Sequence, residues 1–162
     1  MNFEVIDAKN EKDKEIILNL MQFYKYELSF FEDESTNFEL LDNGLFALSK
    51  YSDLFWTEEK RHPYLLRYNG EIAGFVLVRL TGEGYYEISE FFVLNKYRKL
   101  GAGTYMANYV FNLFHGKWEI RTLLKNKKAQ DFWRKVVKDT SGGKYEERFI
   151  RDNTRYAFYF EN

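Results

Sequence analysis

The hydrophobic positions change their period along the chain, and each change marks an expected element. Residues 3–8 alternate as in a short strand. Residues 12–30 predict an amphipathic helix, because one stripe at helical spacing carries Ile16, Leu20, Phe23 and Tyr24. The acidic stretch 32–36 reads as a polar loop, and residues 40–51 have the pattern of a second helix, which Asn43-Gly44 interrupts.

The middle of the chain alternates apolar and turn-forming segments. Apolar runs at 64–68 and 71–81 flank Asn69-Gly70, a strong hairpin signal. A second turn at 82–84 leads into the run 85–94, which is rich in aromatic and β-branched residues. These segments predict an antiparallel meander. His62 precedes the chain's only proline, which favours an extended backbone there.

The last third returns to helical spacing. It predicts a helix over 101–114, a strand over 118–124 and a helix over 127–137. A helical crossover joins the strands 85–94 and 118–124, so they should be parallel. A closing hairpin is expected from strands 144–150 and 154–160. The expected fold is therefore α+β, with a mixed, mostly antiparallel sheet flanked by helices in one domain spanning 1–162.

Composition narrows the chemistry. The 162 residues are 45% hydrophobic and 30% charged with a formal net charge of -1, so no basic field points to nucleic acid. The absence of cysteine excludes disulfides and a thiol nucleophile, and two histidines make a multi-histidine metal centre unexpected. The N-terminal residues lack signal-peptide features, and no apolar run reaches membrane-spanning length. We therefore expect a cytoplasmic protein without a metal.

The run Arg98-Lys99-Leu100-Gly101-Ala102-Gly103 stands between a predicted strand and a predicted helix. Glycines at a helix start leave backbone N–H groups open to an anion. A dinucleotide fingerprint would need a third glycine where Met106 stands, and a P-loop would need a lysine before Thr104. A glycine connector without a ligand is the remaining alternative.

In its position, this run resembles the Arg/Gln-x-x-Gly-x-Gly/Ala motif of the GNAT superfamily of acyl-CoA-dependent N-acyltransferases. A second family element, Asn-x-x-Ala-x-x-Phe-aromatic, has its counterpart in 126–133. The match is strongest over 85–137, and the order of elements extends it over nearly the whole chain. The resemblance implies the GNAT fold, with a splayed parallel strand pair, and an acetyl-CoA-dependent N-acetyltransferase.

The resemblance also implies where acetyl-CoA binds. Backbone N–H groups would hold the pyrophosphate at Arg98, Lys99, Leu100, Gly101, Ala102, Gly103 and Thr104. Val93 and Leu94 would bond to the pantetheine arm, and an N–H of Phe92 or Val93 would stabilise the oxyanion. Asn126 would hold the pantetheine from the other side, and Trp133 belongs to the same donor-binding set. Lys127, Lys128 and Arg134 are further cations near the expected phosphates.

Acyl transfer to an amine needs a base, because an alkyl ammonium has a pKa of about 10.4. Glu90 and Glu87 are the two candidates on the strand 85–94, with Glu90 preferred because it lies closer to the expected break. Strict alternation would put them on opposite faces, and a bulge between them would change that. A salt-bridged structural carboxylate is the alternative for either residue.

The family's usual acid is absent. Many members have a tyrosine seven residues after the asparagine, where this chain has Trp133, whose indole N–H has no useful acidity. Tyr97, Tyr105 or solvent would have to protonate the leaving thiolate. The acceptor pocket is expected from 23–60 and the closing hairpin. Core packing is the alternative to a pocket role for its candidate residues, which are Tyr24, Phe30, Phe31, Trp56 and Tyr159. A polar loop is the preferred interpretation of Glu32, Asp33 and Glu34, and attraction of a cationic amine is the alternative.

Three functions therefore stay open. The leading one is acetyl transfer from acetyl-CoA to a small-molecule or protein amine, without nucleic acid or membrane as partner and with a homodimer left open. A non-catalytic acyl-CoA-binding module on the same fold is the second. A nucleotide-dependent transferase is the third, disfavoured because the P-loop lysine is missing.

Overall fold

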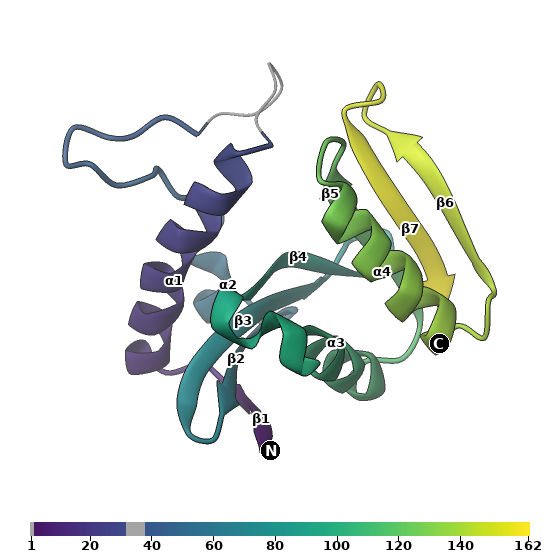
Figure 1. The fold of residues 1–162 in the computed structure, drawn as a ribbon, viewed down its shortest axis with the longest axis horizontal. Coiled ribbons are helices and arrows are strands. Elements are labelled where there is room, and N and C mark those ends of the chain that lie inside the picture. The colour runs from purple at the N-terminus through teal and green to yellow at the C-terminus, as the bar shows by residue number, and fades with distance from the viewer. Residues whose placement is uncertain (1, 32–37) are drawn as a thin grey trace.

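The computed structural model describes residues 2–31 and 38–162, and the elements below belong to these residues. Short alternating segments form strands, and longer segments with an apolar stripe form helices (Figure 1). In chain order they are β1 (Phe3–Asp7), α1 (Glu11–Ser29), α2 (Leu54–Thr57), β2 (Arg61–Tyr68), β3 (Glu71–Leu80), β4 (Tyr85–Val93), the 3₁₀ helix η1 (Asn95–Leu100), α3 (Ala102–Leu113), β5 (Lys117–Leu123), α4 (Lys127–Thr140), β6 (Tyr145–Ile150) and β7 (Arg155–Glu161).

The strands of the described residues form one seven-stranded sheet in the order β1-β2-β3-β4-β5-β7-β6. Neighbours are antiparallel except β4 and β5, which are parallel and joined through η1 and α3. The predicted meander, the parallel pair and the mixed sheet are confirmed. The β2–β3 hairpin turns at Asn69 and Gly70, whose φ angles of 49° and 83° are the left-handed values that Asn-Gly favours.

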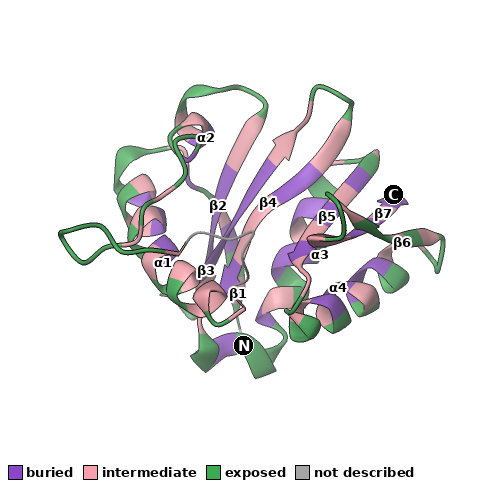
Figure 2. Ribbon diagram, turned by 90° about the horizontal axis from the view of Figure 1, so that it is seen from above, coloured by how far each residue is buried: buried purple, intermediate pink, exposed green. Residues whose placement is uncertain are grey.

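The helices cover the two faces of the sheet separately (Figure 2). On one face, Ile17 and Met21 of α1 pack on Leu65, Phe75 and Phe92 of the central strands. On the other face, α3 and α4 pack around a second core, whose members include Val76, Ile88, Met106, Val110, Trp118 and Phe158. Because these two helices follow β4 and β5, they fix the ends of the parallel pair.

The helix predicted over 40–51 is wrong. Leu40 instead pairs with Phe46 across a turn in which Gly44 has a φ of 78°. The Phe46 backbone forms two hydrogen bonds with the Gln22 side chain, donating to Oε1 at 2.8 Å and accepting from Nε2 at 3.2 Å. These bonds tie the segment to α1 as extended chain, so the turn chemistry of Asn43-Gly44 overrides the helical pattern.

Candidate functional site

A bulge in β4 decides how its two carboxylates are placed. Glu90 pairs with Leu77 of β3 while Ile88 pairs with the next residue, Val78, so Ser89 is the extra residue. Glu87 pairs with Arg79, two residues from Leu77. Positions two apart on a strand share a face, so Glu87 and Glu90 both lie on the face that α1 covers. Strict alternation would have separated them.

Beside the bulge, the sheet opens. β4 and β5 pair only from Tyr85↔Lys117 to Ile88↔Ile120, although both strands continue. The Leu94 N–H donates to the Ala73 carbonyl on the β3 side at 2.8 Å. Because backbone groups alternate sides along a strand, those of Val93 point the other way, toward the gap. The splayed parallel pair is thus present, with β4 backbone groups along one wall.

The glycine run forms the far end of this gap. Gly101 has a φ of 84°, and α3 begins directly after it without a side-chain cap. The Tyr105 N–H donates to the Gly101 carbonyl at 3.0 Å, so the N–H groups of 102–104 precede the first helical bond. A Cβ on Gly103 would meet the Phe132 ring at 3.2 Å. The start of α3 therefore offers open N–H donors and a positive dipole end to an anion.

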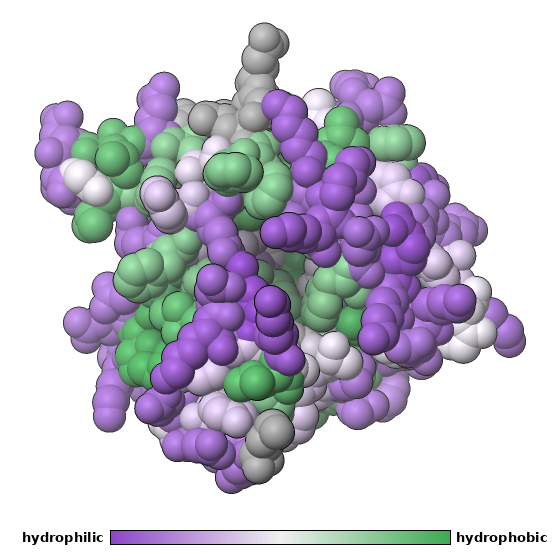
Figure 3. All heavy atoms as spheres, in the orientation of Figure 1, coloured by the Kyte–Doolittle hydropathy of each residue, from purple (hydrophilic) through white to green (hydrophobic). Residues whose placement is uncertain are grey.

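A cavity of about 960 Å³ connects these features. It lies between α1 and α4 as a recess with a mainly hydrophilic rim (Figure 3). Of the residues predicted to hold the donor, the cavity is lined by Phe92, Val93, Arg98, Gly101, Gly103, Thr104, Asn126 and Trp133. The lining formed by the described residues does not include Leu94, Lys99, Leu100 or Ala102.

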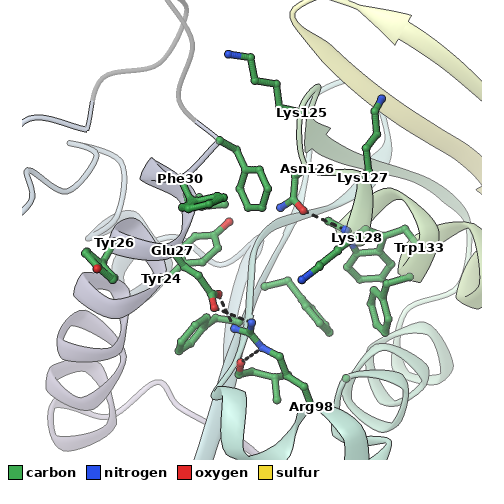
Figure 4. A pocket seen from close by; sticks show the side chains of 18 of the residues that line it. Tyr24, Tyr26, Glu27, Phe30, Arg98, Lys125, Asn126, Lys127, Lys128 and Trp133 are labelled. Atoms are coloured by element: carbon green, nitrogen blue, oxygen red, sulfur yellow. Dashed lines mark hydrogen bonds and ion pairs between the residues drawn. The ribbon is translucent and has the colours of Figure 1, made fainter.

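The side chains enter the cavity from two sides (Figure 4). The C-terminal half of α1 contributes Tyr24, Tyr26, Glu27, Leu28 and Ser29, and Phe30 and Phe31 follow the helix. The start of α4 contributes Asn126, whose Oδ1 accepts from the Ala129 N–H at 3.1 Å and caps the helix. Lys125, Lys127 and Lys128 lie around it and make this wall cationic.

Arg98 links α1 to the end of β4. Its Nε donates to the Val93 carbonyl at 2.7 Å, and its two Nη atoms donate to the Glu27 carboxylate at 2.6 and 2.5 Å. Its guanidinium also lies 5.7 Å from the centre of the Phe92 ring. The Arg98 side chain therefore holds the cavity walls together and satisfies one β4 carbonyl. Arg134, expected near the phosphates, instead pairs with Glu147 and Asp131.

Glu90 has an unusual environment. Its side chain is partly exposed and is not part of the cavity wall, while its neighbour Phe91 is. Its partial burial is the main cause that raises the pKa of the Glu90 carboxyl to about 7, and the charge of Glu87 acts in the same direction. A hydrogen bond from Tyr24 and the charge of Lys25 lower the pKa, but by less than burial raises it. A carboxyl that titrates near neutral pH suits a general base.

Glu87 has a different role. It is 5% exposed and accepts from the Arg79 Nε and Nη2 at 3.0 Å each and from the Arg121 Nη2 at 2.5 Å. Arg121 continues the network to Glu119, which also accepts from the Tyr159 hydroxyl at 3.0 Å. With two guanidinium partners, Glu87 holds β3, β4 and β5 together below the gap. These contacts fit the alternative given for Glu87 in the sequence analysis, a salt-bridged structural carboxylate.

We expect Glu87→Gln to destabilise the protein by about 2–3 kcal/mol, because two partly buried guanidinium groups lose their shared anion. Urea unfolding of the variant and the wild type measures the difference. Glu58→Gln is the matched control, because it makes the same change at a half-exposed carboxylate that pairs with Arg61. A loss at Glu87 no larger than that of the control would contradict the structural role.

The sequence did not identify the contacts that give Tyr24 and Glu27 their place in this site. Tyr24 and Tyr26 are the tyrosines among the described residues that line the cavity, whereas Tyr97 and Tyr105 do not. The Tyr97 hydroxyl donates to Glu71 instead. Trp133 is buried against Phe91 and Phe132, with ring centres 4.8 and 4.9 Å away. The helical spacing of Tyr24 was visible, but its docking on β4 is a tertiary contact.

Only some of the described residues predicted to form the acceptor pocket line the cavity. Tyr24, Phe30 and Phe31 line the cavity. Trp56 packs with α1 and donates to the Ala8 carbonyl at 2.7 Å, and Tyr159 belongs to the network around Glu119. Glu32, Asp33 and Glu34 lie outside the described residues.

A comparison of the sequence with known families identifies this arrangement. The sequence model of the Acetyltransferase (GNAT) family matches residues 20–137, well over half of the chain. The chain belongs to the GNAT acetyltransferase family. The matched region contains both walls of the cavity, from Tyr24 of α1 to Trp133 of α4. No curated protein matches the sequence significantly.

Solved structures of acetyltransferases share this fold at low sequence identity. An acetyltransferase from Thermus thermophilus is 13% identical, with 100% of this chain and 98% of that chain covered and a TM-score of 0.70. A GNAT acetyltransferase from Staphylococcus aureus Mu50 is 17% identical over 99% of both chains, at 0.61. The N-acetyltransferase PseH of Campylobacter jejuni, solved with acetyl coenzyme A, is 10% identical over 99% of both chains, at 0.60.

Within 2–31 and 38–162, no group of three or more His, Cys, Asp or Glu side chains is arranged to hold a metal ion. No helix in the same residues has the length and apolar character needed to cross a membrane.

Proposed function

We propose that this GNAT protein is an N-acetyltransferase that transfers the acetyl group of acetyl-CoA to the amine of a small molecule or a protein. The observation that carries the proposal is the cavity between β4 and α4, which ends at the uncapped start of α3. One connected space thus offers an anion site, a strand edge and a nearby base. The acetyl-CoA complex of PseH, which has the same fold, supports the choice of donor.

The donor fits the groups that line this space. The pyrophosphate is assigned to the N–H groups at the start of α3, where Gly103 and Thr104 line the cavity. The pantetheine arm is assigned to the gap, with the backbone of Val93 on one side and Asn126 on the other. An N–H of the β4 bulge region would stabilise the oxyanion.

Glu90 is proposed as the general base. It lies on the α1 face of β4, directly before the first cavity-lining residue of that strand, and its pKa of about 7 allows the carboxylate to accept a proton at neutral pH. The neutral amine then attacks the thioester carbonyl directly, without a covalent enzyme intermediate. Glu90 is chosen over Glu87 for this role because the Glu87 carboxylate is paired with Arg79 and Arg121.

Two measurements test the function. Isothermal titration with acetyl-CoA should show saturable binding, and a thiol reagent should report CoA release in the presence of a panel of primary amines. No binding at millimolar acetyl-CoA would contradict the proposal. Binding without thiol release over a broad panel of small amines and peptides would favour the non-catalytic acyl-CoA-binding module instead.

We expect Gly103→Ala to weaken acetyl-CoA binding about tenfold, or 1.4 kcal/mol. The added Cβ would lie 3.2 Å from the Phe132 ring, which Phe91 and Trp133 hold in place, at the helix start assigned to the pyrophosphate. Calorimetric titration measures the affinity, and the unfolding midpoint without ligand controls for a general loss of stability. An unchanged dissociation constant would contradict the assignment of the pyrophosphate to the start of α3.

A further inference from the structure

Tyr24 stands where the donor cavity and the proposed base meet. It comes from α1, and its ring packs against Phe75 and Phe92 with ring centres 6.0 and 5.9 Å away. These contacts fix the ring, and its side chain reaches into the cavity (Figure 4). Glu90 lies two residues from Phe92 on the same face of β4, and the Tyr24 hydroxyl is close enough to interact with the Glu90 carboxyl and the Phe91 backbone. Glu90 itself is outside the cavity wall, so Tyr24 connects the cavity to the carboxylate.

The other tyrosines near the motif do not offer such a group. Tyr97 is buried and donates to Glu71, and Tyr105 packs on Phe3 away from the cavity. Trp133, at the family's tyrosine position, presents an indole that cannot act as an acid at neutral pH. Tyr26 lines the cavity but is 73% exposed and has no assigned contact with β4.

We propose that Tyr24 is the catalytic residue that protonates the departing CoA thiolate, and that Glu90 returns a proton to it. This inference rests on the N-acetyltransferase function proposed above. It assigns the acid to α1 instead of α4, and it makes the Tyr24–Glu90 pair a proton path between the amine and the sulfur.

The proton balance closes without another reactant. The acceptor ammonium first loses one proton to solvent. The neutral amine attacks the thioester carbon, forming the C–N bond, and its second proton passes through a water molecule to the Glu90 carboxylate, which lies outside the cavity wall. The C–S bond breaks, its electron pair stays on sulfur, and the sulfur takes the Tyr24 hydroxyl proton. In the same step Glu90 gives its proton to the Tyr24 oxygen, so that amide and CoA thiol leave both residues as they began.

The charges around the pair favour this order. Burial, the charge of Glu90 and its hydrogen bond, and the charge of Glu27 all raise the pKa of Tyr24 well above its usual value, while the Phe91 backbone lowers it. A free phenolate is therefore unfavourable, and Tyr24 gives up its proton only as Glu90 supplies another. On Glu90, the charges of Lys25 and Glu87 act in opposite directions.

Tyr24→Phe tests the inference, because it keeps the ring that packs on Phe75 and Phe92 and removes only the hydroxyl. We expect kcat with acetyl-CoA to fall about 100-fold, at the low end of general acid catalysis because a thiolate is a tolerable leaving group. The dissociation constant of acetyl-CoA should stay within about threefold. Tyr109→Phe, on α3 and outside the cavity lining, is the matched control.

Two further readouts separate proton donation from packing. Loss of the hydrogen bond that lowers the Glu90 pKa should move the acid limb of the pH–rate profile to higher pH. The acetyl thioester of 4-nitrothiophenol has a more acidic thiol, so Tyr24→Phe should lose much less activity with this donor than with acetyl-CoA. An equal loss with both donors, or an unchanged kcat with acetyl-CoA, would overturn the inference. Failure of the wild type to release thiol with any amine would instead overturn the proposed function itself.

Discussion

Replacing Glu90 with glutamine is expected to lower kcat by about 10²–10³-fold, because the amide cannot accept the proton of the attacking amine. The substitution keeps the size of the side chain and leaves the cavity wall unchanged, so the affinity for acetyl-CoA should stay within about threefold. Thiol release at saturating donor, together with calorimetric titration, measures both effects. Retention of more than about a tenth of the wild-type kcat would rule out Glu90 as the base.

The pH dependence gives the same assignment a second test. With a pKa of about 7, Glu90 is the active carboxylate above that pH, so the wild-type rate should rise through pH 7 and then level off. The contribution of Glu90 to the free energy of unfolding should fall over the same rise in pH. Because the folded-state pKa lies above the ordinary value of 4.5, the folded protein binds the extra proton in this range. The contribution of Glu90 to stability is thus present below pH 4.5 and is lost as the pH rises through 7.

Glu90→Gln should therefore be no less stable than the wild type at pH 8, where the wild type holds a desolvated carboxylate. Glu87→Gln makes the same chemical change three residues away and should do the opposite, lowering stability while keeping the acid limb near pH 7. Urea unfolding of the two variants at pH 8 compares them. A larger stability loss in Glu90→Gln than in Glu87→Gln would contradict the roles given to these carboxylates.

The second large effect is expected at Gly74, where β3 passes beside the end of β4. A Cβ at this position would lie 2.2 Å from the Phe92 carbonyl oxygen and 3.0 Å from the Val93 Cα. Both are backbone atoms, so Gly74→Ala must displace β4 at the wall of the gap. We expect a loss of about 3 kcal/mol or more in the free energy of unfolding, which corresponds to roughly 6–12 °C in Tm.

Thermal and urea unfolding of Gly74→Ala measure this loss. Gly82→Ala is the matched control, because its Cβ would meet nothing within 4 Å and its φ is not in the left-handed range. The control should stay within about 0.5 kcal/mol of the wild type. Equal stability of the two variants would mean that β3 and β4 can separate without cost at this position.

The sequence predicted the elements wherever local chemistry dictates them. Asn69-Gly70 fixes its hairpin through the φ values that only such residues adopt readily, and the order of strands and helices after Tyr85 determines the parallel pair. The helix predicted over 40–51 was wrong, because the Phe46 backbone in this segment is hydrogen-bonded to the side chain of Gln22 on α1. No periodicity within the segment carries that information.

The sequence likewise located the parts of the site that depend on local structure, but not those that depend on tertiary contacts. The glycine run and Asn126, which the family resemblance singled out, lie at a local turn and a helix start beside the cavity, and their part in binding acetyl-CoA is a proposal. The shared face of Glu87 and Glu90 depends on the bulge at Ser89, which strict alternation does not reveal. The partners of these carboxylates come from β3, β5 and α1, so only the assembled fold distinguishes the ion-paired Glu87 from Glu90.

The short β4–β5 ladder has a consequence for how the free protein opens. The backbone pairing between the first four strands of the sheet and the last three is limited to the pairs from Tyr85↔Lys117 to Ile88↔Ile120. Amide hydrogen exchange should therefore divide the sheet into two cooperative units at this boundary. A pantetheine arm in the gap would bridge the two units, so the donor substrate would act in part as a structural component whose concentration sets how long the protein survives proteolysis.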